Sequence, residues 1–441
     1  MDYVLIKNGK IIIDEELLVK DVLIGNDKVI LIDDNIDRLD SETPIIDAAG
    51  KCLMPGTVDT NIFFSGMIEQ GEKALKRFNQ TQVLCGTTTL LEPVFPKTSL
   101  SFKKEWNSKK GMNYGVLADY GFHISLQDWD LFKRYDLLYG YFHEGIASFY
   151  LKWPVSAVEL NDVKDLFLAA SDNGLPILIE LISPDVGGED NFNTNFNYHE
   201  NVALHLNQLR SVMGLAVEMN TRICLLNVFF NEEIDVIAPF IASGLIYVEL
   251  MLPYHIGPHE EVFTDRDASF SGFPLDDKLR LIEVEKIWEL LKNDAYLLAR
   301  PMLKISESGV VKEGQVDNRP DQYFLLKNYL SVLYTAGVKS GKISFNDFIS
   351  IVAYRTARLM GLYPKKGVIK VGSDADIVIW NPEYKRNLYC HFSGSDSSAL
   401  KGFMLEGRVE FVFIKGHMAY NGESFSDEDI KGRYLYRNPC F

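Results

Sequence analysis

The sequence lacks the features that mark membrane and secreted proteins. No stretch reaches the length of about 18 consecutive apolar residues that a membrane-spanning helix needs, and the N-terminus, MDYVLIKNGK, has no apolar signal core. The five cysteines are scattered without a CxxC pair, a pattern typical of reduced thiols in a cytosol. We therefore expect a cytoplasmic protein without a membrane partner.

Positive charge and histidine are also scarce. The chain has 45 Lys and Arg against 61 Asp and Glu, and its net charge of −16 repels nucleic acids and anionic lipids. Among the eight histidines, only His255 and His259 have the i, i+4 spacing of a helical metal site. Gly257 and Pro258 lie between them and break such a helix. Each histidine is therefore better explained as a surface or core residue, and no nucleic-acid partner is expected.

Two kinds of pattern alternate along the 441 residues, which suffice for a large barrel domain plus a smaller one. Near the start, apolar runs flank the polar strings KNGK and GNDK, which predicts β-hairpins turning at those strings. From about residue 55 to 355, strand-length runs such as GLPILIELIS alternate with amphipathic segments such as EKALKRFNQTQVL and NVALHLNQLRSVMGLAVEMN, which predicts parallel βα units. Strand patterns return after residue 367.

The economical fold is α/β: a (β/α)₈ TIM-type barrel with a small β-sandwich domain formed by both termini. We place the barrel at residues 55–360, the sandwich at residues 1–54 and 361–425, and a C-terminal tail at residues 426–441. Asp374 and Asp376 then fall in a turn between sandwich strands, and we do not interpret them as a catalytic pair.

Five strings in order along nearly the whole chain carry a family resemblance: LIKNGK with DVLIGNDKVI, CGTTTLLEP, DYGFHISL, GIASF and ARLMGLYPKKGVIKVGSDADIVIWNPE. The set resembles the cyclic amidohydrolases (dihydropyrimidinase, hydantoinase, allantoinase and dihydroorotase) and their non-enzymatic relatives, the collapsin response mediator proteins. The last string is the most specific, and it is similar to the family's join between barrel and sandwich. The resemblance implies a homodimer or homotetramer and a two-zinc hydrolase, whose metal-bridging hydroxide attacks the amide carbon of a ring.

The resemblance also implies a ligand set at the carboxyl ends of the barrel strands: His-x-His, a carboxylated lysine, two further histidines and an aspartate. This chain departs from that set throughout, with, in chain order, Asn61, Phe63, Tyr150, Glu180, Asn227 and, approximately aligned, Arg300. Only Glu180 is an ordinary metal ligand. We therefore predict no metal and no cofactor, although zinc is expected of the family. The same six residues would line a vestigial cleft, with Phe63 filling it and Arg300 paired with Glu180 or Asp59.

Three functions remain open. The favoured one is a protein that has lost metal-dependent hydrolysis of cyclic amides and acts in binding or assembly, with a protein partner or with copies of itself. A second is a cleft that still binds a small cyclic amide or ureide without turning it over. The third is a divergent hydrolase of carbon–nitrogen bonds, other than peptide bonds, in cyclic amides. Its candidate acid–base groups are Asp59, Lys152 and Glu180.

Overall fold

The structure is a computed structural model that describes most of the chain. The described residues are 3–62, 64–65, 71–94, 115–125, 144–153, 160–181, 198–250, 282–299, 320–387, 404–426 and 430–439. Within these ranges, no helix is both long and apolar enough to span a membrane.

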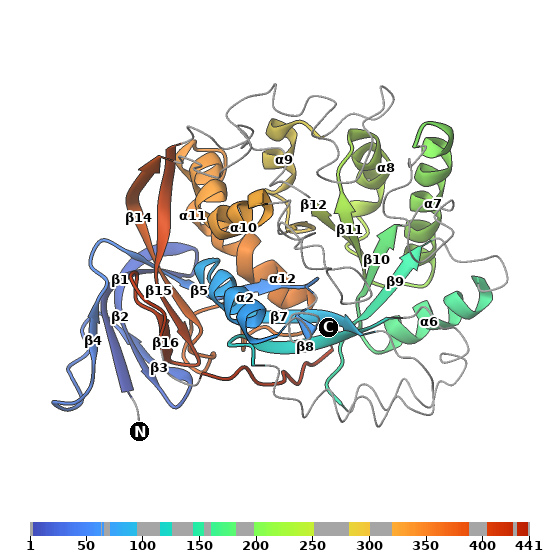
Figure 1. Cartoon of the computed structure of the whole chain (residues 1–441). Coiled ribbons are helices and arrows are strands. Elements are labelled where there is room, and N and C mark those ends of the chain that lie inside the picture. The colour runs from blue at the N-terminus through green and yellow to red at the C-terminus, as the bar shows by residue number, and fades with distance from the viewer. Residues whose placement is uncertain are drawn as a thin grey trace.

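Strands from both ends of the chain form one sheet (Figure 1). Its order is β16-β15-β14-β5-β1-β2-β3, and β4 also pairs with β1. The bounds are β1 (Tyr3–Ile13), β2 (Glu16–Gly25), β3 (Lys28–Asp33), β4 (Ile45–Asp47), β5 (Cys52–Pro55), β14 (Ile377–Asn387), β15 (Met404–Ile414) and β16 (His417–Tyr420). β5 joins the two halves by pairing antiparallel with β14. The predicted β domain made from both termini is confirmed.

The two predicted hairpin turns differ in outcome. GNDK does turn the chain, because Gly25 pairs with Lys28 and the two residues between them have positive φ. The turn predicted at KNGK is wrong. That string lies inside β1 as a bulge, where Asn8 has φ 59° and its N–H donates to Asp21 at 2.9 Å. The buried carboxylate takes up the N–H that the bulge frees, so β1 continues past the string to Ile13.

A second sheet of eight parallel strands follows the chain in strict order. Its strands are β6 (Thr57–Asp59), β7 (Thr87–Val94), β8 (Asp119–Ser125), β9 (Phe149–Trp153), β10 (Ile177–Leu181), β11 (Ile223–Val228), β12 (Ile246–Leu250) and β13 (Tyr296–Leu298). In Figure 1 it curls, with helices on its outer side. The order and the fold similarity reported below confirm the predicted (β/α)₈ barrel.

Helices occupy the amphipathic segments, and EKALKRFNQTQVL matches one of them from end to end. The described helices are α2 (Glu72–Leu84), α6 (Leu160–Asp172), α7 (Tyr198–Glu218), α8 (Asn231–Ile241), α9 (Val284–Leu290), α10 (Pro320–Leu333), α11 (Phe345–Ile349) and α12 (Arg355–Leu359). Two π-helical segments alternate with the last three helices: η4 (Tyr334–Lys339) lies between α10 and α11, and η5 (Ser350–Tyr354) lies between α11 and α12.

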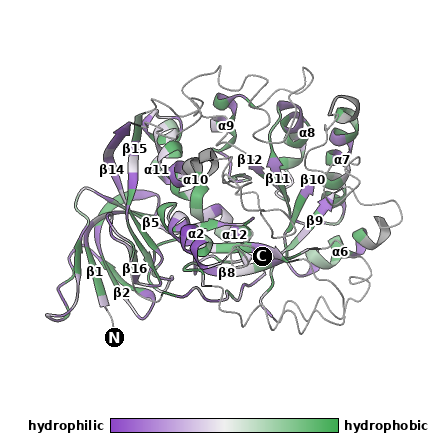
Figure 2. Cartoon of the chain, viewed as in Figure 1, coloured by the Kyte–Doolittle hydropathy of each residue, from purple (hydrophilic) through white to green (hydrophobic). Residues whose placement is uncertain are grey.

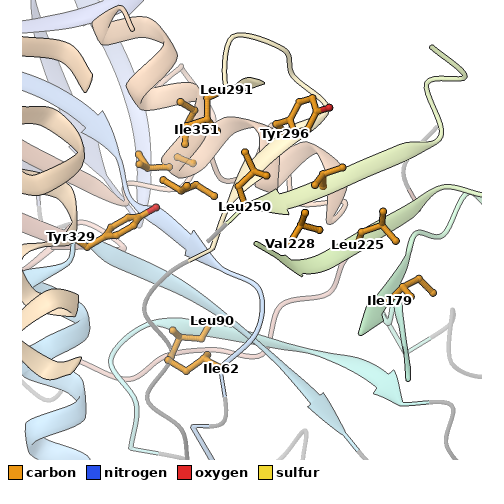
Figure 3. Packing of buried hydrophobic residues seen from close by; sticks show 14 of the residues in the cluster. Ile62, Leu90, Ile179, Leu225, Val228, Leu250, Leu291, Tyr296, Tyr329 and Ile351 are labelled. Carbon is orange, nitrogen blue, oxygen red and sulfur yellow. The ribbon is translucent and has the colours of Figure 1, made fainter. Parts of the chain in front are cut away.

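Two apolar layers hold the barrel. The outer layer lies between strands and helices and includes Leu225, Leu250 and Tyr296 (Figure 3). A smaller cluster, which includes Leu178 and Cys224, consists of residues on the opposite face of the strands, toward the interior of the barrel. Alternate strand residues therefore face the helices or the interior of the barrel. Figure 2 shows hydrophilic colour toward the carboxyl ends of β9, β10 and β11, where polar side chains interrupt these layers.

A buried ion cluster ties the two sheets together. Lys366, in the predicted joining string, lies 2.7 Å from Asp119 on β8, 2.5 Å from Asp376 and 3.0 Å from Asp374. All four side chains are almost fully buried. Asp374 and Asp376 thus serve a structural ion pair, in keeping with the prediction that they are not catalytic. The domain boundaries themselves stay a prediction.

Candidate functional site

The predicted site residues that the structure describes lie on four strands and one strand-end turn of the barrel. Asp59 ends β6 and is buried, and the backbone N–H of Asn61 donates to its Oδ1 at 3.3 Å. Tyr150 and Lys152 lie on β9, and Glu180 and Asn227 lie near the ends of β10 and β11. Phe63 and Arg300 fall outside the described residues. Their predicted packing and pairing therefore stay predictions.

One short hydrogen bond joins two of these residues. The hydroxyl of Tyr150 donates to Oε2 of Glu180 on the neighbouring strand. The ring of Tyr150 is buried, and the carboxylate of Glu180 is half-buried. The pairing of β9 with β10 also sets Lys152 directly beside Glu180. Glu180, the one ordinary metal ligand among the six predicted positions, therefore accepts a hydrogen bond from the Tyr150 phenol.

A carboxylate that sequence reasoning missed faces Asp59. Glu249 lies on β12, and burial together with the negative charge of Asp59 raises the pKa of Glu249 to about 8. β6 ends the sheet order and β12 lies next to its other end, so this interaction joins strands that meet only because the sheet curls toward closure. Glu249 is therefore largely protonated at neutral pH. The only signal for Glu249 in the sequence is a single acid in the apolar run GLIYVELML.

A bulge places Asn227 beside this pair. The register of β11 against β12 shifts between Leu225 and Val228, which sets Leu226 and Asn227 opposite Glu249. Asn227 has φ 57°, a left-handed conformation that asparagine adopts more readily than most residues. The amide at this predicted ligand position is thus held by an irregular strand end.

A second missed carboxylate fixes the chain after β6. Glu92, on β7, is buried and accepts a short hydrogen bond from the Ser65 hydroxyl and two longer ones, at 3.3 Å, from its backbone N–H. The string CGTTTLLEP carried the family resemblance, but its glutamate gave no functional signal. We call the carboxyl-end opening of the barrel, where Asp59, Glu180 and Asn227 lie, the mouth. We assign Glu92 to the support of the mouth, because its described hydrogen bonds are to the backbone and side chain of Ser65, which follows β6.

His123 agrees with its prediction as a core residue. It is fully buried on β8, where Nε2 lies 2.9 Å from the carbonyl of Thr60 and Nδ1 lies 2.5 Å from Ser148 Oγ. Burial holds the pKa of His123 well below its usual value, and the nearby charge of Arg437 lowers it further. The imidazole is therefore neutral at physiological pH.

The donors at the family's ligand positions do not match a zinc pair. Protein zinc sites use thiolates, imidazoles and carboxylates, whereas the described positions offer the amides of Asn61 and Asn227 and the phenol of Tyr150. Glu180 is a carboxylate that already accepts a hydrogen bond. Among the described residues, no group of three or more His, Cys, Asp and Glu side chains is arranged to hold a metal.

The eight-stranded barrel, the sandwich built from both termini and the strand-end site define an amidohydrolase-type protein. A sequence model of the Amidohydrolase family matches residues 323–419. The D-hydantoinase of Geobacillus stearothermophilus is 25% identical over 98% of this chain and 96% of its own length. The dihydropyrimidinase of Arabidopsis thaliana is 24% identical over 99% and 86%, and the dihydropyrimidinase-related protein 5 of Homo sapiens is 22% identical over 98% and 80%.

Solved structures agree with these relatives on the fold. The D-hydantoinase (dihydropyrimidinase) from Thermus sp. superposes with a TM-score of 0.75 at 22% identity, covering 99% of each chain. The dihydropyrimidinase from Brevibacillus agri gives a TM-score of 0.73 at 22% identity over the same shares. The chain is thus similar along nearly its whole length to D-hydantoinases and dihydropyrimidinases, and it has a fold of the same type.

Proposed function

We propose that this protein has lost the zinc-dependent hydrolysis of cyclic amides and acts in binding or assembly. The observation that carries the proposal is the short hydrogen bond from Tyr150 to Glu180. A phenol at the position of the bridging lysine cannot form a carbamate. The glutamate beside it accepts a hydrogen bond from that phenol, so the two residues partner each other without a metal between them.

The remaining positions support the same proposal. Asn61 and Asn227 replace imidazoles by amides, which are poor zinc ligands. Without a metal, the attacking water keeps its high pKa and the ring carbonyl is not polarised. The framework around these positions is intact, since the sheet, the β6 turn and the strand ends are all formed. A scaffold kept in this way can serve a binding surface.

We further propose that the mouth binds a small cyclic amide or ureide. Such a ring presents an N–H beside a C=O. The Asp59 carboxylate can accept the N–H, and the protonated Glu249 can donate to the C=O. Binding should therefore weaken as the pH rises through about 8, where Glu249 loses its proton. Glu249→Gln, which keeps a donor at all pH values, should abolish this weakening.

Assembly and location complete the proposal. We propose a homo-oligomer, a dimer or tetramer, in the cytoplasm, with a further protein partner as the alternative use of the scaffold. Light scattering at micromolar concentration should give a mass of at least twice the 50.1 kDa of one chain. A mass near one chain would contradict the oligomer.

A second candidate is a divergent hydrolase of carbon–nitrogen bonds in cyclic amides. The observation in its favour is the pair formed by Asp59 and Glu249, whose environments separate their protonation states. A neutral acid facing a carboxylate is an arrangement that enzymes use for acid–base catalysis. In that case Asp59 would act as the base and Glu249 as the acid, without a metal.

One assay separates the two candidates. The protein, purified without chelators, is incubated with dihydrouracil, hydantoin, allantoin and dihydroorotate, with and without added zinc or cobalt. The D-hydantoinase of Geobacillus stearothermophilus serves as the positive control for the hydantoin assay. Turnover at background supports the binding protein, and a thermal-shift screen with cyclic ureides and imides then tests the ligand, because binding raises apparent stability. Turnover that Asp59→Asn abolishes would establish the divergent hydrolase instead.

A further inference from the structure

The C-terminal segment 430–439 enters the barrel from the end opposite the mouth. Its backbone follows β8, with Leu435 N–H donating to Tyr120 O at 2.7 Å and Tyr120 N–H donating to Arg433 O at 2.9 Å. Asp119 and Tyr120 begin β8, so this contact lies at the amino end of the strand. Leu435 is buried in the apolar cluster that contains Leu178. The segment is thus part of the barrel core.

The close approach of the segment is built into the sequence. Gly432 N–H donates to Val116 O at 2.8 Å, and a Cβ on Gly432 would lie 1.8 Å from the carbonyl oxygen of Ala118. Gly145 has φ 82°, and a Cβ there would meet the ring and backbone of Tyr436 at 2.7 to 2.8 Å. Only glycine allows the chain to pass at these two places.

A buried arginine continues from the segment into the barrel. Arg437 is 1% exposed, and its guanidinium donates to Ser148 Oγ at 2.8 Å, to Met360 O at 3.3 Å and, by a short bond, to Phe122 O. Its backbone N–H donates to Gly145 O at 3.1 Å. Two of the three acceptors of the guanidinium are backbone carbonyls, so its position depends on β8, which carries Phe122, and on the end of α12, where Met360 lies.

The hydrogen bonds beyond Arg437 have one possible direction. A backbone carbonyl only accepts, so Nε2–H of His123 donates to the carbonyl of Thr60, 2.9 Å away. A neutral imidazole that carries its proton on Nε2 accepts at Nδ1, so the Ser148 hydroxyl donates to Nδ1. A guanidinium only donates, so Ser148 Oγ also accepts from Arg437. Thr60 lies between Asp59 and Asn61, in the turn that carries both mouth residues.

We propose that segment 430–439 is a strut that fixes the β6 turn from the opposite end of the barrel, with Arg437 as its positioning residue. The connection is Arg437, Ser148, His123 and the Thr60 carbonyl, and every side chain in it is at least nine-tenths buried. Arg437 holds the Ser148 hydroxyl from one side, and that hydroxyl holds Nδ1 of His123 from the other. Fixed in this way, the imidazole keeps its Nε2–H on the Thr60 carbonyl. The inference goes beyond the proposed function and needs no ligand.

The first test is hydrogen exchange and nitrogen NMR on the full chain carrying Arg437→Met. Without the guanidinium, Ser148 loses the donor that holds its hydroxyl and His123 loses a nearby positive charge, so the pKa of His123 should rise and its hydrogen bond to Thr60 should loosen. The amides of Asn61 and Ile62 should exchange about tenfold faster or more, because their bonds, both 3.3 Å long, depend on the turn. Arg433→Met is the matched control, since this exposed arginine of the same segment pairs with Asp27 and not with the barrel interior.

A uniform rise in exchange across the β domain would show a merely structural loss and would overturn the strut. So would a folded Arg437→Met chain in which the pKa of His123 and the exchange of the turn match the parent. If Arg437→Met does not fold, Ser148→Ala decides the question by the exchange of the turn, because it removes the middle hydroxyl and leaves the segment intact. Arg437→Lys, which retains a donor and a positive charge, should restore the low pKa of His123 and the slow exchange of the turn, and failure of this rescue with a correctly folded chain also contradicts the proposal.

Discussion

Replacing Lys366 by methionine should weaken the join between barrel and β domain more than any nearby surface change. The ammonium of Lys366 is 1% exposed and lies within 3.0 Å of three buried carboxylates: Asp119, Asp374 and Asp376. Removing one partner of a buried ion pair costs about 3–5 kcal/mol, because the partner charge stays buried without compensation. Lys28 and Lys415 still face Asp374 and Asp119, so we expect the lower part of that range.

The expected loss depends on pH. Burial raises the pKa of Asp119 and of Asp374, but the charge of Lys366 outweighs it and holds both below the usual value. Their stabilisation is therefore present above the unfolded pKa of about 3.9 and is lost as the pH falls through the folded pKa. In Lys366→Met these carboxylates bind protons more readily, so the deficit relative to the parent should be larger at pH 8 than at pH 5.

The assay is urea unfolding followed by circular dichroism and tryptophan fluorescence at both pH values. Lys365→Met is the control, because its ammonium lies 4.0 Å from Asp374 with 47% of the side chain exposed. A pair exposed to that degree contributes about 0–1 kcal/mol. A Lys366→Met protein within about 1 kcal/mol of the parent, with no difference between the two pH values, would refute the reasoning.

Three further outcomes are expected. Glu249→Gln should stabilise the fold more at pH 8 than at pH 5. The pKa of Glu249 is raised to about 8 in the folded protein, so the parent loses stability as the pH rises from the unfolded pKa of Glu249 to the folded one. The loss is about 1.4 kcal/mol per pH unit. Denaturant titrations at both values check this, and equal effects would count against a protonated Glu249. Leu435→Ala should cost about 2–5 kcal/mol by opening a cavity in the barrel interior, and a loss typical of a surface site would show that the segment is not part of the core. Gly432→Ala should displace the segment, since its Cβ would lie 1.8 Å from Ala118 O. Gly214→Ala, with no atom within 4 Å, should instead stabilise helix α7 by about 0.5–1 kcal/mol. Thermal unfolding that ranks the two glycine variants the other way would contradict the geometry.

The fold was predictable because hydrophobic period and element order are local properties of the sequence. The alternation of apolar runs and amphipathic segments gave the strand order of the barrel, and EKALKRFNQTQVL gave the bounds of α2. The turn predicted at KNGK failed for a non-local reason. Asp21, on the next strand, accepts the N–H of Asn8 and lets β1 run through the bulge. No property of the four letters themselves distinguishes that bulge from a turn.

The site was only partly predictable. The places of Tyr150 on β9 and of Glu180 near the end of β10 follow from the order of the strings, but the hydrogen bond between them does not. Glu249 was missed because its partner, Asp59, is 190 residues away and meets it only when the sheet closes on itself. The role of Arg437 was also not predictable, since no pattern around this C-terminal residue indicates that its side chain enters the barrel at the amino end of β8.

The central claim is that the site no longer holds zinc, and metal content tests it most directly. The protein is purified without chelators, incubated with excess zinc, passed through a desalting column and measured by elemental analysis together with protein concentration. The account predicts well below one zinc per chain, because amides and a phenol replace the family's imidazoles and bridging lysine. Stoichiometric zinc that is retained by the folded chain and lost on Glu180→Gln would contradict it.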